Sequence, residues 1–287
     1  MKVGVVGAGT MGSGIAQTFA MNGHDVTMVD VAEAQLERGL ATIRGSLAKL
    51  AEKDKLVAPP GEIAARIRAA TDVAALADAD LVVEAAYEDP AVKQELFATL
   101  DRVTRKDVIL ASNTSSISID ALAARTTRPG RVAGMHFMNP VPVMRLVEVV
   151  RGPRTSEETL GAIVDLAKRL GKTPVVSADR PGFIANRILM PMINEAFLAL
   201  DEKVGTAEDI DTVMTLGMNH PIGPLRLADL IGLDVCVAIM EVLERDLGSA
   251  KYAPAPNLRR LVAEGRLGRK SGRGVYDYEQ SRVEATA

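Results

Sequence analysis

The sequence predicts an α/β domain with a doubly wound, mostly parallel sheet, followed by an all-α C-terminal domain. A short β-branched run, residues 3–6, leads without a spacer into Gly7-x-Gly9-x-x-Gly12 and then into a helix-compatible stretch. Strand-like and helix-like segments then alternate, which is typical of a parallel sheet covered by helices on both faces. After residue 180 the periodic segments are helical only. We therefore expect two domains, residues 1–180 and 181–287.

The glycine motif predicts a nucleotide-binding turn. Gly7 permits a tight turn, Gly9 leaves no side chain between the backbone and a pyrophosphate, and Gly12 lets the helix pack closely on the strand. The phosphates would lie at the helix N-terminus, where unpaired N–H groups and the helix dipole favour anions. Because strand, turn and helix occur in the required order, a Rossmann-type dinucleotide site is favoured over a flexible glycine loop. Its expected lining residues are Gly7, Ala8, Gly9, Thr10, Met11 and Gly12.

A carboxylate indicates which dinucleotide is bound. Residues 24–30 form a second apolar run that ends in Asp30, 18 residues after Gly12. In such folds an acid about 20 residues beyond the glycines binds the ribose 2′-OH. A phosphate at that position would meet a like charge, so the sequence favours NAD over NADP.

Composition excludes several classes of protein. The 34 Lys and Arg residues are balanced by 37 Asp and Glu residues, so there is no basic field for nucleic acid. Neither a membrane span nor a secretory leader is expected, because no apolar run approaches 18 residues and Met1 leads straight into the first strand. The single cysteine, Cys236, lies in an apolar run, where a packing role is expected. We expect a cytoplasmic protein with no nucleic-acid or membrane partner and no metal.

The elements follow from local periodicity and from turn residues. Strands are expected at residues 3–6, 24–30, 67–71, 81–84, 108–112, 131–136, 144–150 and 173–177. Helices are expected at residues 13–21, 32–57, 73–76, 90–102, 119–124, 156–170, 182–200, 206–216, 224–230, 233–247 and 258–264. Helix 32–57 is longer than a usual crossover helix and should project as a hairpin with residues 62–68. The glycine-rich, basic tail 268–276 fits either closure over an anionic ligand or a solvated end.

One of the three histidines stands where a general base is needed. His24 falls in a turn away from the nucleotide end of the sheet, and His220 lies between helices. His136 ends a strand on the ligand side. Glu148 follows in the next apolar strand, where an ionisable group needs a partner. A carboxylate paired with His136 would orient the imidazole and stabilise its cation, although a buried structural pair fits the same spacing.

Two further polar residues stand where packing would favour apolar side chains. Ser115 follows strand 108–112 at its carboxyl end, and Asn186 interrupts the first helix of the second domain. Each fits a ligand contact. Each also fits a structural role, as a helix cap for the serine and as a helix–helix hydrogen bond for the asparagine.

Motifs shared with one enzyme family run through nearly the whole chain. They are Gly7-x-Gly-x-x-Gly12, Val83-Glu-Ala85, Ser112-Asn-Thr-Ser-Ser116, His136-Phe-Met-Asn-Pro-Val-Pro142, Leu146-Val-Glu148, Pro181-Gly-Phe-Ile-Ala-Asn-Arg187, Asp229-Leu-Ile-Gly-Leu-Asp234 and Gly268-Arg-Lys-Ser-Gly272. On these residues the sequence resembles the short-chain (S)-3-hydroxyacyl-CoA dehydrogenases, of the 3-hydroxybutyryl-CoA dehydrogenase type. Tyr87-Glu-Asp89 and Met138 depart from the commoner residues of those motifs.

The resemblance implies NAD-dependent, reversible oxidation of a 3-hydroxyacyl-CoA to a 3-ketoacyl-CoA. It implies that His136 and Glu148 form the catalytic pair and that Ser115 and Asn186 contact the substrate oxygen. Contacts to NAD are implied for Asp30, Glu88, Lys93, Ser115, Asn139 and Lys270, and contacts to coenzyme A for Ser46 and Lys53. A homodimer formed through the helical domain is also implied.

The residue pattern by itself leaves alternatives. On the expected helix 32–57, Ser46, Lys49 and Lys53 would share one face suited to nucleotide phosphates. The alternating charges around them equally fit a solvated face. The rival functions are a dehydrogenase of a free hydroxy or sugar acid on the same scaffold and a non-catalytic dinucleotide-binding or structural protein. The presence of all four candidate catalytic residues favours an enzyme.

Overall fold

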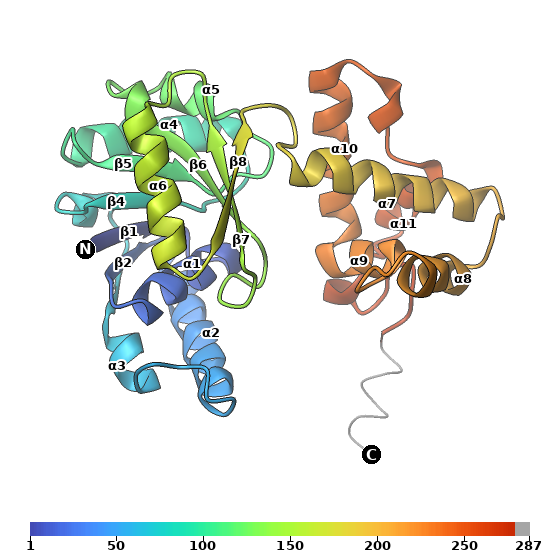
Figure 1. Ribbon diagram of the computed structural model, residues 1–287, viewed down its shortest axis with the longest axis horizontal. Coiled ribbons are helices and arrows are strands. Elements are labelled where there is room, and N and C mark those ends of the chain that lie inside the picture. Colours follow the sequence, from blue (N-terminus) through green and yellow to red (C-terminus); the bar gives the residue numbers. More distant parts are fainter. Residues whose placement is uncertain (279–287) are drawn as a thin grey trace. The chain divides into compact units, whose positions relative to one another are not determined.

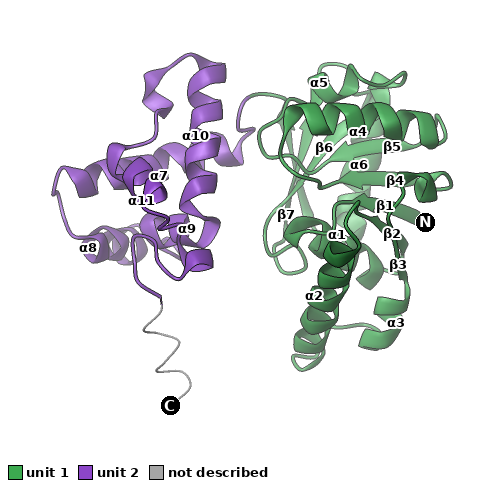
Figure 2. Cartoon of the chain, turned by 180° about the vertical axis from the view of Figure 1, so that it is seen from behind, with its two compact units in different colours: residues 1–180 green, residues 181–287 purple. Residues whose placement is uncertain are grey.

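The computed structural model describes residues 1–278. The chain forms two compact units, residues 1–180 and a unit that begins at Pro181 (Figure 2). The first contains a sheet with helices, and the described part of the second is helical.

The first unit is built on an eight-stranded sheet with the order β3-β2-β1-β4-β5-β6-β7-β8. The strands are β1 (Lys2–Val6), β2 (Asp25–Val29), β3 (Ile67–Ala70), β4 (Leu81–Glu84), β5 (Ile109–Ser112), β6 (Val132–Phe137), β7 (Leu146–Arg151) and β8 (Thr173–Ala178). All neighbours pair in parallel except β6 and β7, which are antiparallel. The predicted doubly wound, mostly parallel sheet is confirmed.

Helices cover both faces of this sheet. They are α1 (Thr10–Met21), α2 (Glu33–Ala51), α3 (Pro60–Ala65), α4 (Pro90–Val103), α5 (Ile119–Ala123) and α6 (Glu157–Arg169). Figure 1 shows α6 in front of the sheet and α4 behind it. From β1 the chain first adds β2 and β3 on one side of the sheet and then returns to add β4 on the other side. Such a switch point opens a ligand crevice at the carboxyl ends of the strands.

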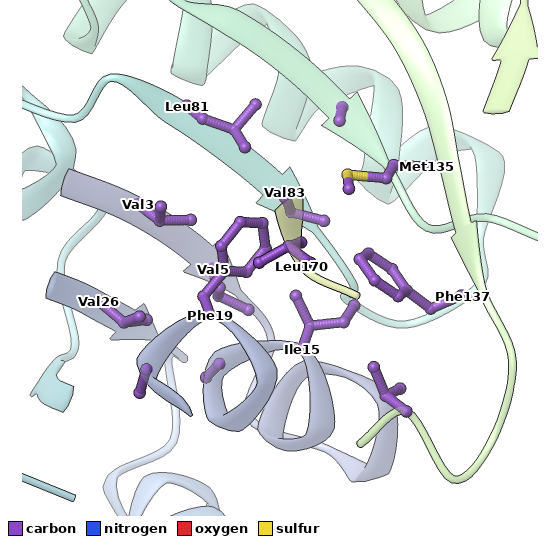
Figure 3. Packing of buried hydrophobic residues seen from close by; sticks show 14 of the residues in the cluster. Val3, Val5, Ile15, Phe19, Val26, Leu81, Val83, Met135, Phe137 and Leu170 are labelled. Atoms are coloured by element: carbon purple, nitrogen blue, oxygen red, sulfur yellow. The ribbon is translucent and has the colours of Figure 1, made fainter. Parts of the chain in front are cut away.

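The core between the sheet and α1 is made of aliphatic and aromatic side chains (Figure 3). Ile15 and Phe19 of α1 are fully buried and meet apolar side chains from the strands. Those labelled in the figure are Val3, Val5, Val26, Leu81, Val83, Met135 and Phe137. This packing fixes the start of α1, and therefore the glycine turn, against the ends of β1 and β4.

The expected helix 32–57 is wrong at its C-terminal end. Helix α2 stops at Ala51 because Asp54 adopts the left-handed region with φ +51°, where the N–H of Asp54 donates to Ala51 O over 3.0 Å. Pro60 then begins α3, since proline is pre-organised for the first helical position. Lys53 therefore lies beyond the helix, and its predicted place on one helical face with Ser46 is wrong.

The second unit contains α7 (Ala185–Asp201), α8 (Ala207–Thr212), α9 (Pro224–Ile231), α10 (Leu233–Leu247) and α11 (Pro256–Ala263). Helix α8 continues into a π-helical turn, Val213–Gly217, which shortens the expected helix 206–216. Cys236 is fully buried in the core of this unit, and burial raises the pKa of its thiol to about 12. A packing role follows, because a thiol so protonated is unreactive at neutral pH.

The glycine-rich segment 268–276 is folded onto α9 rather than left as a solvated end. The buried carboxylate of Asp229 accepts hydrogen bonds from the N–H groups of Val275 and Tyr276, at 2.9 and 3.0 Å, and from the Tyr278 hydroxyl at 3.0 Å. Asp211 accepts from the Tyr276 hydroxyl at 2.7 Å. The segment is thereby held at several points within its own unit.

Among residues 1–278, no helix is both long and apolar enough to cross a membrane.

Replacement of Phe19 by alanine should destabilise the first unit. Its ring is fully buried, so Phe19→Ala removes apolar contacts and leaves a cavity that costs about 3–5 kcal/mol. Thermal unfolding followed by circular dichroism should show a midpoint several degrees lower. The control, Val57→Ala, alters a side chain that is 93% exposed and should stay within about 2 °C of the wild type. Equal midpoints for the two variants would contradict the packing described.

Candidate active site

The glycine turn between β1 and α1 has the shape that a dinucleotide needs. Gly7 has φ +101°, and a Cβ on Gly12 would lie 1.8 Å from the Gly7 carbonyl oxygen. Over Gly9 there is open space, because the nearest heavy atom to a Cβ there would be Gln35 Nε2 at 3.9 Å. Thr10 and Met11 begin α1, whose first turn carries no acidic residue. The turn thus offers an anion the open backbone and the positive end of a helix.

Asp30 lies directly beside this turn, after the last residue of β2. Its Oδ2 accepts a hydrogen bond from the Ala8 N–H at 2.9 Å, and its Oδ1 accepts from the Ala32 N–H at 3.1 Å. These bonds hold a carboxylate at the edge of the nucleotide site. The residues present therefore fit a dinucleotide with a free ribose hydroxyl, such as NAD.

His136 and Glu148 form a cross-strand pair. The antiparallel register of β6 and β7 places them directly opposite each other. His136 Nδ1 lies 3.3 Å from Glu148 Oε2, and the two side chains are 10% and 2% exposed. The sequence located both residues, and the structure brings them together.

This pairing determines what the imidazole can do chemically. A carboxylate acceptor beside Nδ1 favours the tautomer in which Nδ1 carries the proton. Nε2 then keeps a lone pair that can take a proton, and the charge of the resulting cation is stabilised by Glu148. The pair is therefore suited to general acid–base catalysis.

A buried ammonium lies at the ends of β4 and β5. Lys93, in α4, is 1% exposed, and its Nζ lies 2.5 Å from Glu84 Oε1 and 3.0 Å from Glu88 Oε2. Glu88 Oε1 also accepts from the Thr114 hydroxyl at 2.5 Å and from the Ser115 N–H at 3.0 Å. Burial alone would raise the pKa of Glu88, but the Lys93 ammonium and these hydrogen bonds hold it below its ordinary value of 4.5.

Ser115 lies in the turn after β5, in the same region of the sheet as His136. The turn is joined to β6 because Asn113 Oδ1 accepts from the Phe137 N–H at 2.8 Å. Ser115 is not the cap of α5, since that role belongs to Ser118, whose hydroxyl accepts from the Ala121 N–H at 3.2 Å. The carboxyl ends of two adjacent parallel strands thus deliver Ser115 and His136.

The loop between β6 and β7 carries Asn139, which is exposed and joined to Pro140 by a cis peptide bond. Lys172 anchors this loop. Its Nζ donates to the carbonyl oxygens of Val141 and Met144 at 2.5 and 2.8 Å, and burial lowers its pKa. Sequence reasoning missed Lys172, because nothing in its neighbourhood distinguishes it from a surface lysine.

Four predicted contact residues belong to the second unit or to α2 and the segment after it. Asn186 is buried in the first turn of α7, and Lys270 Nζ lies 2.6 Å from Asp234 Oδ1; both belong to the second unit. Ser46 is half-buried on α2, whereas Lys53 is exposed beyond its end. The roles of these four residues stay predictions. Within residues 1–278, no group of three or more His, Cys, Asp or Glu side chains is placed to hold a metal ion.

Comparison with known proteins identifies the family. Residues 2–180 match the 3-hydroxyacyl-CoA dehydrogenase NAD binding domain, and residues 182–278 match the C-terminal domain of the same enzymes. The chain belongs to the 3-hydroxyacyl-CoA dehydrogenase family. The resemblance predicted from the sequence motifs is confirmed.

Relatives within the 3-hydroxyacyl-CoA dehydrogenase family match over nearly their full length. A probable 3-hydroxybutyryl-CoA dehydrogenase of Deinococcus radiodurans is 54% identical, with 97% of this chain and 100% of that protein covered. The human mitochondrial hydroxyacyl-coenzyme A dehydrogenase is 44% identical, with 96% and 91% covered. The crystal structure of (S)-3-hydroxybutyryl-CoA dehydrogenase from Ralstonia eutropha superposes with a TM-score of 0.92 at 52% identity and covers 97% of this chain and 99% of that one.

Gly12→Ala should weaken binding of the cofactor typical of this dehydrogenase family. The new Cβ would lie 1.8 Å from Gly7 O, so the turn must shift. NADH affinity should fall by about tenfold to a hundredfold, measured by fluorescence titration. The matched control is Gly161→Ala in α6, where a Cβ meets nothing within 4 Å. That variant should bind NADH like the wild type and gain about 1 kcal/mol of stability. Wild-type affinity in folded Gly12→Ala would refute the described turn.

Glu88 should stabilise the fold in a pH-dependent way. Its pKa in the folded protein is lowered below 4.5, so its contribution is fully present above that value and is lost as the pH falls through the folded-state pKa. The difference in thermal midpoint between wild type and Glu88→Gln should therefore be largest near neutral pH and shrink in acid. A difference that grows as the pH falls would contradict this direction of the pKa shift.

Proposed function

We propose that this chain catalyses the NAD-dependent, reversible oxidation of an (S)-3-hydroxyacyl-CoA to a 3-ketoacyl-CoA, with 3-hydroxybutyryl-CoA and acetoacetyl-CoA as the pair. The buried His136–Glu148 pair carries the proposal, at the same edge of the sheet as the dinucleotide turn. The proposal is supported by a relative at 52% identity that is named a 3-hydroxybutyryl-CoA dehydrogenase and by one at 54% that is named a probable one.

His136 and Glu148 would perform the proton chemistry. In the oxidation, Nε2 of His136 takes the proton of the C3 hydroxyl, and Glu148 stabilises the imidazolium that forms. NAD, when bound, accepts the hydride that leaves C3. The Ser115 hydroxyl and the Asn186 amide would donate hydrogen bonds to the substrate oxygen as its bond to C3 becomes double. In the reduction, the imidazolium returns the proton.

The remaining predicted contacts divide between the two ligands. Residues 7–12 and Asp30 would bind the pyrophosphate and adenosine ribose of NAD, and Glu88, Lys93, Asn139 and Lys270 would contact the rest of it. Ser46 and the exposed Lys53 would bind coenzyme A phosphates, since an ammonium and a hydroxyl suit such oxygens. The predicted homodimer and cytoplasmic location belong to the same proposal.

A substrate panel tests the function. NADH consumption should be measured in parallel with acetoacetyl-CoA, free acetoacetate and oxidised sugar acids. We expect rapid turnover of acetoacetyl-CoA alone. Preference for a free acid would replace the proposal with the rival dehydrogenase, and inactivity on the whole panel would favour a non-catalytic dinucleotide-binding protein.

Loss of the His136 imidazole should remove most of the activity. His136→Gln should lower kcat by roughly two to four powers of ten, the range for a positioned general acid–base group, with a much smaller change in KM. His24→Gln is the matched control. It alters a histidine of the same unit that packs against Phe19, 5.8 Å between ring centroids, and should keep wild-type kcat. Near-native turnover in folded His136→Gln would overturn the assignment.

Asp30 should determine cofactor preference. The wild type should have a kcat/KM for NADH at least about tenfold higher than for NADPH, because a 2′-phosphate would approach the Asp30 carboxylate. Asp30→Ser should narrow this ratio, whereas Asp25→Asn at the other end of β2 should leave it unchanged. Equal efficiency of the wild type with both cofactors would show that Asp30 is not near the ribose hydroxyls.

A further inference from the structure

Glu84 is a fully buried carboxylate at the end of the central strand β4. Its strand neighbours are Val6, which leads into the glycine turn, and Ser112, which leads into the turn that carries Ser115. Glu84 Oε1 accepts from Lys93 Nζ at 2.5 Å and from the Ala86 N–H at 2.7 Å. Its Oε2 accepts from the Ser112 hydroxyl at 2.6 Å.

These bonds form part of a closed ring of side chains that one backbone N–H, that of Thr114, completes. Lys93 connects Glu84 to Glu88, and Glu88 accepts from the Thr114 hydroxyl at 2.5 Å. The Thr114 N–H donates to Ser112 Oγ at 3.2 Å, and Ser112 returns to Glu84. Glu84 thus has two partners in the ring: the Lys93 ammonium and the Ser112 hydroxyl, which precedes the turn that carries Ser115.

Glu84 is the more deeply buried of the two carboxylates that pair with Lys93. The Glu84 and Lys93 side chains are 0% and 1% exposed, whereas the Glu88 side chain is 37% exposed. A buried ammonium that loses its partner is strongly unfavourable. Without the negative charge of Glu84, the lysine would have to move toward Glu88 and the solvent, and the position of Glu88 on the Ser115 turn would change with it.

We propose that Glu84 is a positioning residue of the active site. It holds the Lys93 ammonium for the cofactor and, through Ser112, holds the turn that presents Ser115 to the substrate. One carboxylate thereby fixes groups that act on both ligands. This inference rests on the proposed function, because that function assigns Lys93 to NAD and Ser115 to the substrate oxygen.

The first test is Glu84→Gln, which keeps the shape of the side chain and removes its charge. The dissociation constant of NADH, measured by fluorescence without acyl-CoA, should rise about tenfold, and kcat with acetoacetyl-CoA should fall about tenfold. Wild-type values of both in the folded variant would overturn the proposal.

A double-variant cycle separates positioning from general stabilisation. If Glu84 acts on NADH through the ammonium, Glu84→Gln combined with Lys93→Met should bind NADH within about twofold of Lys93→Met alone. If the double variant instead loses NADH affinity by the product of the two single-variant losses, Glu84 does not act through Lys93. The double variant also serves if Glu84→Gln fails to fold, because it removes both members of the buried ion pair.

Asp101→Asn is the matched control. Asp101 is a buried carboxylate in α4 that pairs with Arg128, with 3.0 Å between Arg128 Nε and Asp101 Oδ1. Its replacement should lower the thermal midpoint and leave NADH affinity within about twofold. An equal loss of NADH affinity in this control would overturn the proposal. Because NADH binding is measured without substrate, a wild type that binds NADH but does not reduce acetoacetyl-CoA would count against the proposed function alone.

Discussion

The antiparallel pairing of β6 with β7 is the interaction on which the candidate active site depends. It is the one antiparallel pair in the described sheet, and its register places His136 opposite Glu148. The flanking pair Met135 and Val149 is buried in the apolar core. If the register of β7 against β6 slipped by one residue, every side chain of the shifted strand would move to the other face of the sheet. The apolar residue would leave the core, and His136 and Glu148 would no longer face each other. The hydrophobic core therefore enforces the geometry of the pair that we assign to acid–base chemistry.

The parallel strands contribute in a complementary way. The ends of β1, β4 and β5 deliver the glycine turn, the carboxylate of Glu84 and the Ser115 turn to one edge of the sheet. Charged side chains at this edge are costly to bury unless they are paired. Here Lys93 lies between two carboxylates. The hydroxyl groups of Ser112, at the end of β5, and Thr114, in the turn after it, donate to those carboxylates. The ion pairs and hydrogen bonds that stabilise these buried charges thus also hold the site residues in place.

Local patterns predicted most of the fold. The strand before Gly7 and the helices after Arg180 can be recognised from short stretches of sequence. Helix α10, for example, has the expected bounds, Leu233–Leu247. The end of α2 was missed because good helix formers continue past the point where the backbone of Asp54 becomes left-handed. His136 and Glu148 were found from their positions in strands, but their distance depends on register. Ring members such as Ser112 were missed, because hydrogen bonds between distant segments leave no local signal.

The claim that Glu148 selects the tautomer of His136 is tested most directly by finding which ring nitrogen carries the proton. Nitrogen-15 NMR can report it, since the chain has only three histidines and the spectrum of His136→Gln identifies the signals of His136. At a pH where the imidazole is neutral, we expect Nδ1 to carry the proton and Nε2 to lack one. A neutral His136 protonated on Nε2, with an unprotonated Nδ1 facing Glu148, would contradict it.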